Sequence, residues 1–178
     1  GKVYRASMGA REGRLVKKSE IVMRIAGESG EGVISTGDIF TQAAARTGHH
    51  VLTFRTYPAE IKGGHAWFQV RVSDRPVLSM GDQLDVLVAF NAEGYEKHIE
   101  ELKEDGVLIY DPDMVTPPPH PQTAYAVPAT SIARKDLDFL RGKNLVILGL
   151  LSNLFGLEHS SLGSTTRAIT FGRQIPIT

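Results

Sequence analysis

The order of apolar and polar positions divides the first third of the chain into strand, loop, helix and strand. The run IVMRIAG (21–27) is compact and β-rich, and VISTGDIFTQAAARTG (33–48) repeats apolar residues at helical spacing through Val33, Phe40 and Ala44. Gly48 stands where the C-terminal cap of a helix is expected, and HVLTFRT (50–56) has the composition of a second strand. This order predicts a right-handed βαβ unit and therefore a parallel sheet.

The middle of the chain supplies further strands. LDVLVAFN (84–91) is a continuous apolar run, typical of a strand covered on both faces, and GVLIYDP (106–112) predicts another strand. In the run 65–80, apolar and polar residues alternate before a Ser-Asp-Arg-Pro turn, which predicts an inserted antiparallel hairpin with Trp67 and Phe68 on opposite faces. The predicted fold class is α/β: a Rossmann-like, mostly parallel sheet flanked by helices, with an inserted antiparallel hairpin.

The remaining segments predict helices and one edge strand. Residues 93–106 form an amphipathic pattern that places Tyr95, Ile99 and Leu102 inward. After a proline-rich connection (112–123), TAYAVPAT (123–130) suits an edge strand, and Ser131 can cap a short helix through Leu140. Residues 144–155 predict a helix that is apolar on nearly every side. Such a helix belongs either to the core of this domain or to a contact with another subunit.

Length and composition indicate one domain with terminal extensions. The chain has 178 residues, 42% of them hydrophobic, which is enough for one real core. We expect a basic N-terminal arm at 1–19, either solvated or a contact strip, an α/β domain at 20–160, and a tail or the start of a linker to a further domain at 161–178. The opening Gly1 and the abrupt end at Thr178 suggest a trimmed or continuing polypeptide.

Charge and residue usage exclude several classes of protein. Lys plus Arg number 20 and so do Asp plus Glu, so no polyanion-binding surface is indicated and nucleic acid is a poor candidate partner. The chain has no cysteine, so it cannot itself hold a thiolate iron–sulfur cluster. No apolar run reaches 18 residues, which predicts a soluble cytoplasmic protein without a membrane segment. The six histidines lack metal-ligand spacing, and no metal site is predicted.

The glycine loop GESGEG (27–32) is the first candidate site. It lies between a predicted strand and helix, where free amides can bind phosphate, but Ser29 replaces the middle glycine of the dinucleotide motif. A helix terminus gives an anion roughly 0.3 to 1 kcal/mol, whereas a like charge at about 4 Å costs about 4 kcal/mol. Glu28 and Glu31 must therefore turn outward, or accept hydrogen bonds from the ligand. The alternative is a tight turn that needs glycine for close packing.

A second candidate site is YPAEIKGGHAW (57–67), which contains the only tryptophan. Gly63 and Gly64 permit a close approach of the backbone to a neighbour, and Arg55 and Lys62 place positive charge near an anionic ligand. The alternative is a rigid turn that holds the hairpin. No residue here has the surroundings of a nucleophile or general base, so no catalytic residue is predicted.

The segments GESGEGV (27–33), RTYPAEIKGGHAWFQVRVSD (55–74) and DVLVAFN (85–91) together resemble one family. It is the gamma domain of the 2-oxoacid:ferredoxin (acceptor) oxidoreductases, especially the form fused at the N-terminus of the alpha subunit in 2-oxoglutarate enzymes. The resemblance covers roughly residues 20–155. In this family the positions of Ser29 and Glu31 usually hold glycine and glutamine.

The resemblance implies a complex that oxidatively decarboxylates a 2-oxoacid, with 2-oxoglutarate favoured, transfers the acyl group to coenzyme A and reduces ferredoxin. Thiamine diphosphate, magnesium and the iron–sulfur cluster would lie on the alpha and beta subunits or domains of a hetero-oligomer, and this chain alone would be inactive. The residues that the resemblance assigns to coenzyme A are Gly27, Glu28, Ser29, Gly30, Glu31 and Gly32. The loop amides would contact the phosphates and both glutamates would avoid them. The alternatives are a stand-alone enzyme or sensor that binds an adenine nucleotide, and a purely architectural subunit.

Overall fold

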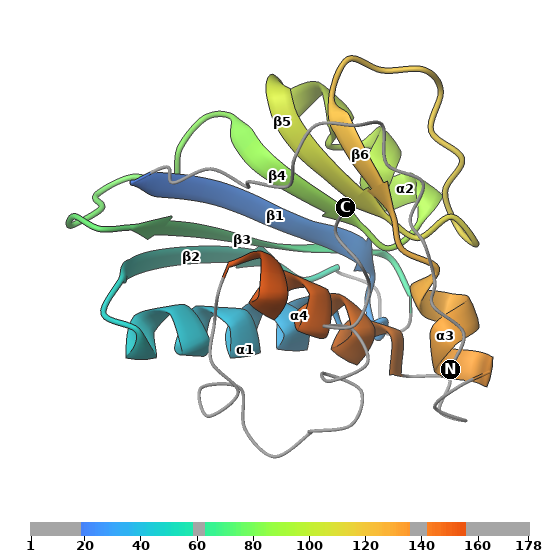
Figure 1. Cartoon of the computed structure of the whole chain (residues 1–178), viewed down its shortest axis with the longest axis horizontal. Coiled ribbons are helices and arrows are strands. Elements are labelled where there is room, and N and C mark those ends of the chain that lie inside the picture. Colours follow the sequence, from blue (N-terminus) through green and yellow to red (C-terminus); the bar gives the residue numbers. More distant parts are fainter. Residues whose placement is uncertain (1–18, 59–62, 136–141, 156–178) are drawn as a thin grey trace.

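One six-stranded sheet organises the computed structural model, which describes residues 19–58, 63–135 and 142–155. The strands are β1 (Glu20–Glu28), β2 (His50–Thr56), β3 (His65–Ser73), β4 (Leu84–Ala89), β5 (Leu102–Tyr110) and β6 (Thr123–Ala126). The helices are α1 (Val33–Arg46), α2 (Ala92–Glu96), α3 (Ala129–Lys135) and α4 (Lys143–Leu154), with a 3-10 turn η1 (Ile99–Glu101). In Figure 1, α1 and α4 lie side by side beneath one face of the sheet.

The strand order is β2-β3-β1-β4-β5-β6. Strand β3 runs antiparallel to both of its neighbours, β1 and β2, whereas β1, β4, β5 and β6 pair in parallel. Five strands therefore share one direction, which confirms the mostly parallel α/β fold with an antiparallel insertion. The chain crosses from β1 through α1 to β2 in the predicted order, but β3 lies between these two strands.

The predicted hairpin at 65–80 is wrong in its second half. Only His65–Ser73 forms a strand, and residues 74–80 form bends and irregular backbone. The reason is that β3 pairs with β1 from Ser73 to His65 and with β2 from Ser73 to Trp67. Both hydrogen-bonding edges of β3 are occupied, so no edge remains for a returning arm. The prediction that Trp67 and Phe68 face opposite sides is confirmed by the alternation along this strand, where Phe68 is fully buried.

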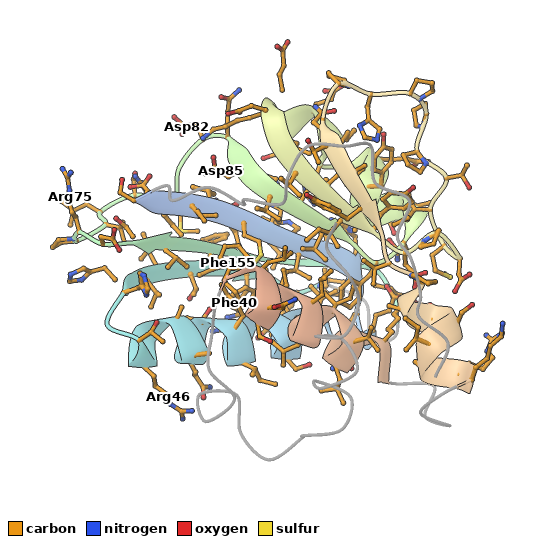
Figure 2. All side chains as sticks on the ribbon, viewed as in Figure 1. Phe40, Arg46, Arg75, Asp82, Asp85 and Phe155 are labelled. Atoms are coloured by element: carbon orange, nitrogen blue, oxygen red, sulfur yellow. The ribbon has the colours of Figure 1, made fainter. Side chains whose placement is uncertain are left out.

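The main core lies between the sheet and the pair of helices α1 and α4. Buried side chains from three strands meet the two helices there: Met23, Ile25, Phe68, Val70, Val86, Val88, Phe40, Val146, Leu148 and Leu151. Phe40 of α1 contacts Phe155, just after α4, edge to face with ring centroids 5.0 Å apart (Figure 2). Since its apolar residues on several sides are buried, α4 belongs to the core of this domain.

A second, smaller core covers the other face of the sheet. Val22, Leu87 and Leu108 point there because side chains alternate along each strand, and Tyr95 of α2 packs on them. The helix predicted over 93–106 is wrong beyond α2, which ends at Glu96. Leu102 opens β5 instead, where it pairs with Leu84. The inward direction of Tyr95, Ile99 and Leu102 is nevertheless correct, since all three belong to this cluster.

Strand β6 lies at the edge of the sheet, as predicted, and leads into α3. Ser131 does not cap this helix, because α3 begins at Ala129. The first amides are bound by carboxylates from the loop after β5 instead. Asp111 accepts from Thr130 N at 2.9 Å, and Asp113 accepts from Ser131 N at 2.8 Å.

Several sequence predictions fall outside the described residues. They concern the basic arm up to residue 18, Lys62 of the second loop, the end of α3 beyond Lys135, and the C-terminal segment from residue 156 onward. Within the described ranges, no helix has the length and apolar character needed to span a membrane.

Candidate functional site

The glycine loop (residues 27–32) connects the end of β1 to the start of α1. Gly30 and Gly32 have φ angles of 96° and 91°, a conformation that L side chains rarely adopt. A Cβ on Gly27 would lie 2.8 Å from Phe90 Cβ, and one on Gly32 would lie 2.7 Å from the side chain of Asn144. At Gly30 nothing lies within 4 Å of such an atom. The loop thus combines close packing at its two ends with an open position in its middle.

The backbone amides of the loop divide into bonded and available groups. Ser29 N donates to Gly64 O at 2.9 Å, and Glu31 N donates to Glu28 O at 3.1 Å. The amides of Gly30 and Gly32 donate no hydrogen bond to any acceptor in the described part of the chain. Gly32 is also the N-cap of α1, and no side chain caps this helix. Two amides at the positive end of a helix dipole are therefore available to an anion.

Glu31 points into the loop. Its Oε2 accepts from Glu28 N at 2.8 Å and from Asn91 Nδ2 at 3.1 Å, and its Oε1 forms an ion pair with Lys143 Nζ. Of the two alternatives for the glutamates, the outward direction therefore does not hold for Glu31, whereas the prediction that both avoid the phosphates stays a prediction. Three donors compensate the burial of its carboxylate, which the sequence pattern of the loop alone does not reveal. Glu28 is exposed, and its side chain lies over Gly63, where an added Cβ would be 3.0 Å from Oε1.

The second candidate site contacts the first. Gly63 and Gly64 both have positive φ angles, and Gly64 O accepts the bond from Ser29 N. The structure therefore brings Gly63 and Gly64 to the glycine loop. Arg55 is directed elsewhere. It pairs with Asp38 of α1 at 3.1 Å and places its guanidinium 5.2 Å from the Phe68 ring.

Comparisons with known proteins identify the family of this chain. Residues 22–172 match the family model of the pyruvate ferredoxin/flavodoxin oxidoreductases. The chain belongs to this family. Its structure is similar to that of a 2-oxoglutarate:ferredoxin oxidoreductase from Magnetococcus marinus with 2-oxoglutarate, coenzyme A and succinyl-CoA bound. The sequence identity is 37% and the TM-score 0.77, over 89% of this chain and 30% of that one.

Two further relatives define how much of an oxidoreductase of this family the chain represents. It is 34% identical to the 2-oxoglutarate oxidoreductase subunit KorA of Mycobacterium tuberculosis over 79% of its own length, but it covers only 26% of that protein. The gamma subunit of a keto/oxoacid ferredoxin oxidoreductase from Geobacter sulfurreducens is 27% identical with a TM-score of 0.73, and the chain covers 93% of it. The chain thus corresponds to a whole gamma subunit or to a part of a longer subunit. The predicted family and the gamma-domain resemblance are confirmed.

Three residues of this oxidoreductase domain complete the glycine loop and were not predicted from the sequence. Asn91 follows β4, caps α2 by accepting from Gly94 N at 2.8 Å, and donates to Glu31. Lys143 and Asn144 begin α4, where Asn144 packs on Gly32 and its Oδ1 is buried without a partner among the described residues. Asn91 could have been found, because β1 and β4 are parallel neighbours whose carboxyl ends meet at one edge. Lys143 gives no local signal.

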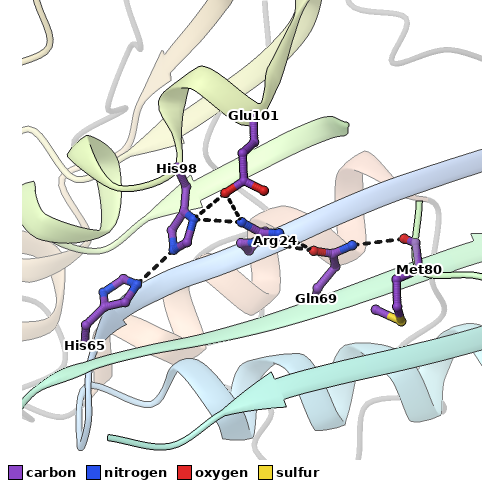
Figure 3. Close-up of polar contacts among 6 residues, drawn as sticks. All are labelled: Arg24, His65, Gln69, Met80, His98 and Glu101. Carbon is purple, nitrogen blue, oxygen red and sulfur yellow. Dashed lines mark hydrogen bonds and ion pairs between the residues drawn. The ribbon is translucent and has the colours of Figure 1, made fainter. Parts of the chain in front are cut away.

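The oxidoreductase domain also contains a polar network on the face of the sheet opposite α1 and α4 (Figure 3). Arg24 of β1 is 7% exposed and donates through Nε to Gln69 Oε1 at 3.0 Å and through Nη1 to Glu101 Oε1. Gln69 Nε2 donates to Met80 O at 2.9 Å, and the Arg24 guanidinium lies 4.5 Å from the Trp67 ring. This network connects β1 and β3 to η1.

Histidines close the network at its other end. His98 Nδ1 lies 2.9 Å from Glu101 Oε1, and His98 Nε2 lies 2.8 Å from His65 Nε2. Burial is the main cause that lowers the pKa of both His65 and His98, and Arg24 and Lys97 lower both pKa values further. Because His65 directly follows Gly64, the network ends beside the second loop.

Proposed function

We propose that this chain is the gamma domain of a 2-oxoacid:ferredoxin oxidoreductase complex and that it helps to bind coenzyme A. The complex would convert a 2-oxoacid anion, coenzyme A and two oxidised ferredoxins to acyl-CoA, carbon dioxide, two reduced ferredoxins and a proton. 2-Oxoglutarate is the favoured substrate, because the similar Magnetococcus marinus enzyme has 2-oxoglutarate, coenzyme A and succinyl-CoA bound. Alpha and beta subunits or domains are the expected partners in a hetero-oligomer.

The observation that carries the binding role is the pair of available amides at Gly30 and Gly32, beside the open position at Gly30. Phosphate oxygens accept from such amides at the start of a helix. The residues proposed for the site remain those of the glycine loop, together with Gly63 and Gly64. Arg55 and Lys62 stay in the proposal as cations that would lie near the anionic ligand, and in the structure Arg55 pairs with Asp38.

Other cofactors of such a complex are expected outside this chain. A thiolate-held iron–sulfur cluster needs cysteines, and the sequence has none. In the described ranges, no group of three His, Cys, Asp or Glu side chains lies together where it could hold a metal ion. As the family resemblance implies, we place thiamine diphosphate, magnesium and the cluster on partner subunits or domains in this proposal. They would supply the decarboxylation and the electron transfer, and this domain would hold and orient the acyl acceptor. The cytoplasmic location stays a prediction.

A purely architectural role is the second candidate. It is favoured by the packing of Gly27 on Phe90 and of Gly32 on Asn144. These close contacts explain why both positions need glycine without any ligand. Under this alternative the glycine loop only brings α1 close to β4 and α4. Coenzyme A would then be bound entirely by other parts of the complex.

One substitution separates these roles, measured in the full-length protein with its partner subunits. Gly30→Asp adds a carboxylate at an open, positive-φ position beside the available amides, so it should weaken coenzyme A binding at least about 10-fold. Gly48→Asp is the matched control, because Gly48 has a φ of 90° and nothing within 4 Å of an added Cβ, at the other end of α1. Unchanged affinity after Gly30→Asp would favour the architectural role.

A thermal-shift comparison tests the ligand class. Coenzyme A at 100 times its Kd should stabilise the protein by about 2.7 kcal/mol, because it binds only the folded state. ATP and NADP serve as competing ligands for a stand-alone nucleotide-binding protein. Stabilisation by NADP alone would reject coenzyme A as the ligand.

A further inference from the structure

The buried ion pair between Glu31 and Lys143 has the composition of an occupied anion site. Three donors of different kinds converge on one carboxylate: the Glu28 amide, the Asn91 side-chain amide and the Lys143 ammonium. Only 15% of the Glu31 side chain and 11% of the Lys143 side chain are exposed. Water therefore screens this pair much less than a surface ion pair.

The same donors suit a phosphate group. Phosphate and carboxylate oxygens both accept charge-assisted hydrogen bonds from ammonium groups and from backbone amides. Lys143 Nζ is also held 5.4 Å from the Phe90 ring, at the base of the glycine loop. The cation is thus kept beside the loop by α4 and Phe90 as well as by Glu31.

A carboxylate and a phosphate cannot share these donors, because two like charges would lie at contact distance. We infer that the Glu31 carboxylate occupies an anion position of the glycine loop, and that a phosphate group of the ligand displaces it and takes its place at Lys143. This inference rests on the proposed binding of coenzyme A. It names Lys143 as a ligand-binding residue and Glu31 as an internal competitor.

The loop has the means for this exchange. Glu31 lies between Gly30 and Gly32, two residues at which the backbone adopts positive φ angles. The position at Gly30 is open, with nothing within 4 Å of an added Cβ. After leaving Lys143, the Glu31 side chain can move into this open region. Lys143 and Asn91 belong to other elements and keep their places.

Two neutralising substitutions test the exchange by their opposite effects. Glu31→Gln removes the competing charge, so it should tighten coenzyme A binding about 10-fold. Lys143→Met removes the cation and should weaken binding by about 10-fold or more. Both affinities are measured by isothermal titration calorimetry on the full-length protein with its partner subunits. Lys97→Met is the matched control, because Lys97 pairs with Glu93 on the exposed face of α2 and should leave the affinity unchanged.

The ligand series assigns the phosphate group. Pantetheine lacks phosphate, so neither substitution should change its affinity. Dephospho-CoA retains the diphosphate and lacks the 3′-phosphate. A Lys143→Met effect that persists with dephospho-CoA assigns the lysine to the diphosphate, and an effect that disappears assigns it to the 3′-phosphate.

The opposite outcomes are distinct. Wild-type affinity in both variants, or equal weakening in both with a lower melting temperature, would mean that the pair only holds α4 to the loop, and the inference would be overturned while the proposed function stands. Absence of coenzyme A binding in the wild-type protein would instead reject the proposed function. Should Lys143→Met fail to fold, the Glu31→Gln result decides alone, because the inference requires tighter binding there.

Discussion

His65 and His98 face each other with their Nε2 atoms 2.8 Å apart. At this distance one nitrogen must donate a proton and the other must accept it, so the contact cannot persist when both rings are fully protonated. His98 is also within 2.9 Å of Glu101, while His65 Nδ1 is buried and lacks a partner among the described residues. The pair thus favours neutral histidine in the folded protein.

Stability should therefore fall as the pH drops below the ordinary histidine pKa of about 6.5. Burial, the largest cause, lowers the pKa of both histidines, and the surrounding charges of Arg24, Lys97, Glu93 and Glu101 do not reverse this direction. The unfolded chain then binds more protons than the folded one, and unfolding becomes easier as the pH falls from about 7 to 5.

The pH effect can be measured by urea denaturation at pH 7.5, 6.5 and 5.5. His98→Gln removes one titrating ring and the Nε2 contact, so its free energy of unfolding should depend less on pH than that of the wild-type protein. His50→Gln, at an exposed histidine of β2, is the control and should keep the wild-type dependence. If the free energy of unfolding of His98→Gln depends on pH as strongly as that of the wild-type protein, this account is contradicted.

Arg24 should be essential for the stability of the sheet. It donates to Gln69 Oε1 and pairs with Glu101, so Arg24→Met leaves Gln69 Oε1 without its donor and leaves Glu101 with only its contact to His98. Removal of one partner from a buried ion pair costs about 3–5 kcal/mol, and the 38% exposure of the Glu101 side chain reduces the expected loss to about 2–3 kcal/mol. Arg24→Lys keeps the charge but loses the planar fork, so we expect an intermediate loss. A loss below about 1 kcal/mol in urea denaturation would argue against the network.

Local patterns predicted most of the strands, because the continuous apolar runs of β1, β4 and β5 reflect burial on both faces of the sheet. The position of β3 between β1 and β2 was not predictable in this way, since it depends on pairing between distant segments. The pattern of Tyr95, Ile99 and Leu102 marked the inward side chains correctly. It could not distinguish a helix from a turn that leads into β5, because spacing alone allows both.

The same division applies to the candidate site. The glycines of the loop were recognisable from local sequence. Gly30 and Gly32 adopt positive φ angles, and this requirement depends on the local turn rather than on distant residues. The inward direction of Glu31 was not, since its ammonium partner Lys143 lies 112 positions away in the sequence. A charge argument based on the loop alone omitted this cation, and it therefore considered only an outward carboxylate or one that accepts hydrogen bonds from the ligand.

The Phe68 ring of β3 packs directly against Gly37 of α1. A Cβ on Gly37 would lie 2.2 Å from Phe68 Cδ1, and Phe68 is fully buried. Gly37→Ala should therefore destabilise the fold by about 1–3 kcal/mol, although alanine favours helix. Ser35→Ala, at an exposed position of the same helix, is the control and should be neutral or slightly stabilising. If Gly37→Ala raises the melting temperature, the close contact between α1 and β3 is wrong.

Asp111 should hold the start of α3 more strongly than Asp113. Its carboxylate is 2% exposed and accepts from three donors: Thr130 N at 2.9 Å, Thr130 Oγ1 at 2.6 Å and Asp113 N at 3.1 Å. Asp111→Ala leaves these groups without their acceptor, and we expect a loss of about 2–3 kcal/mol. Asp113 accepts one bond at the surface, from Ser131 N, so Asp113→Ala should cost about 0.5–1 kcal/mol. Urea denaturation of both variants gives the comparison, and equal losses would show that burial of the Asp111 bonds adds nothing to the cap.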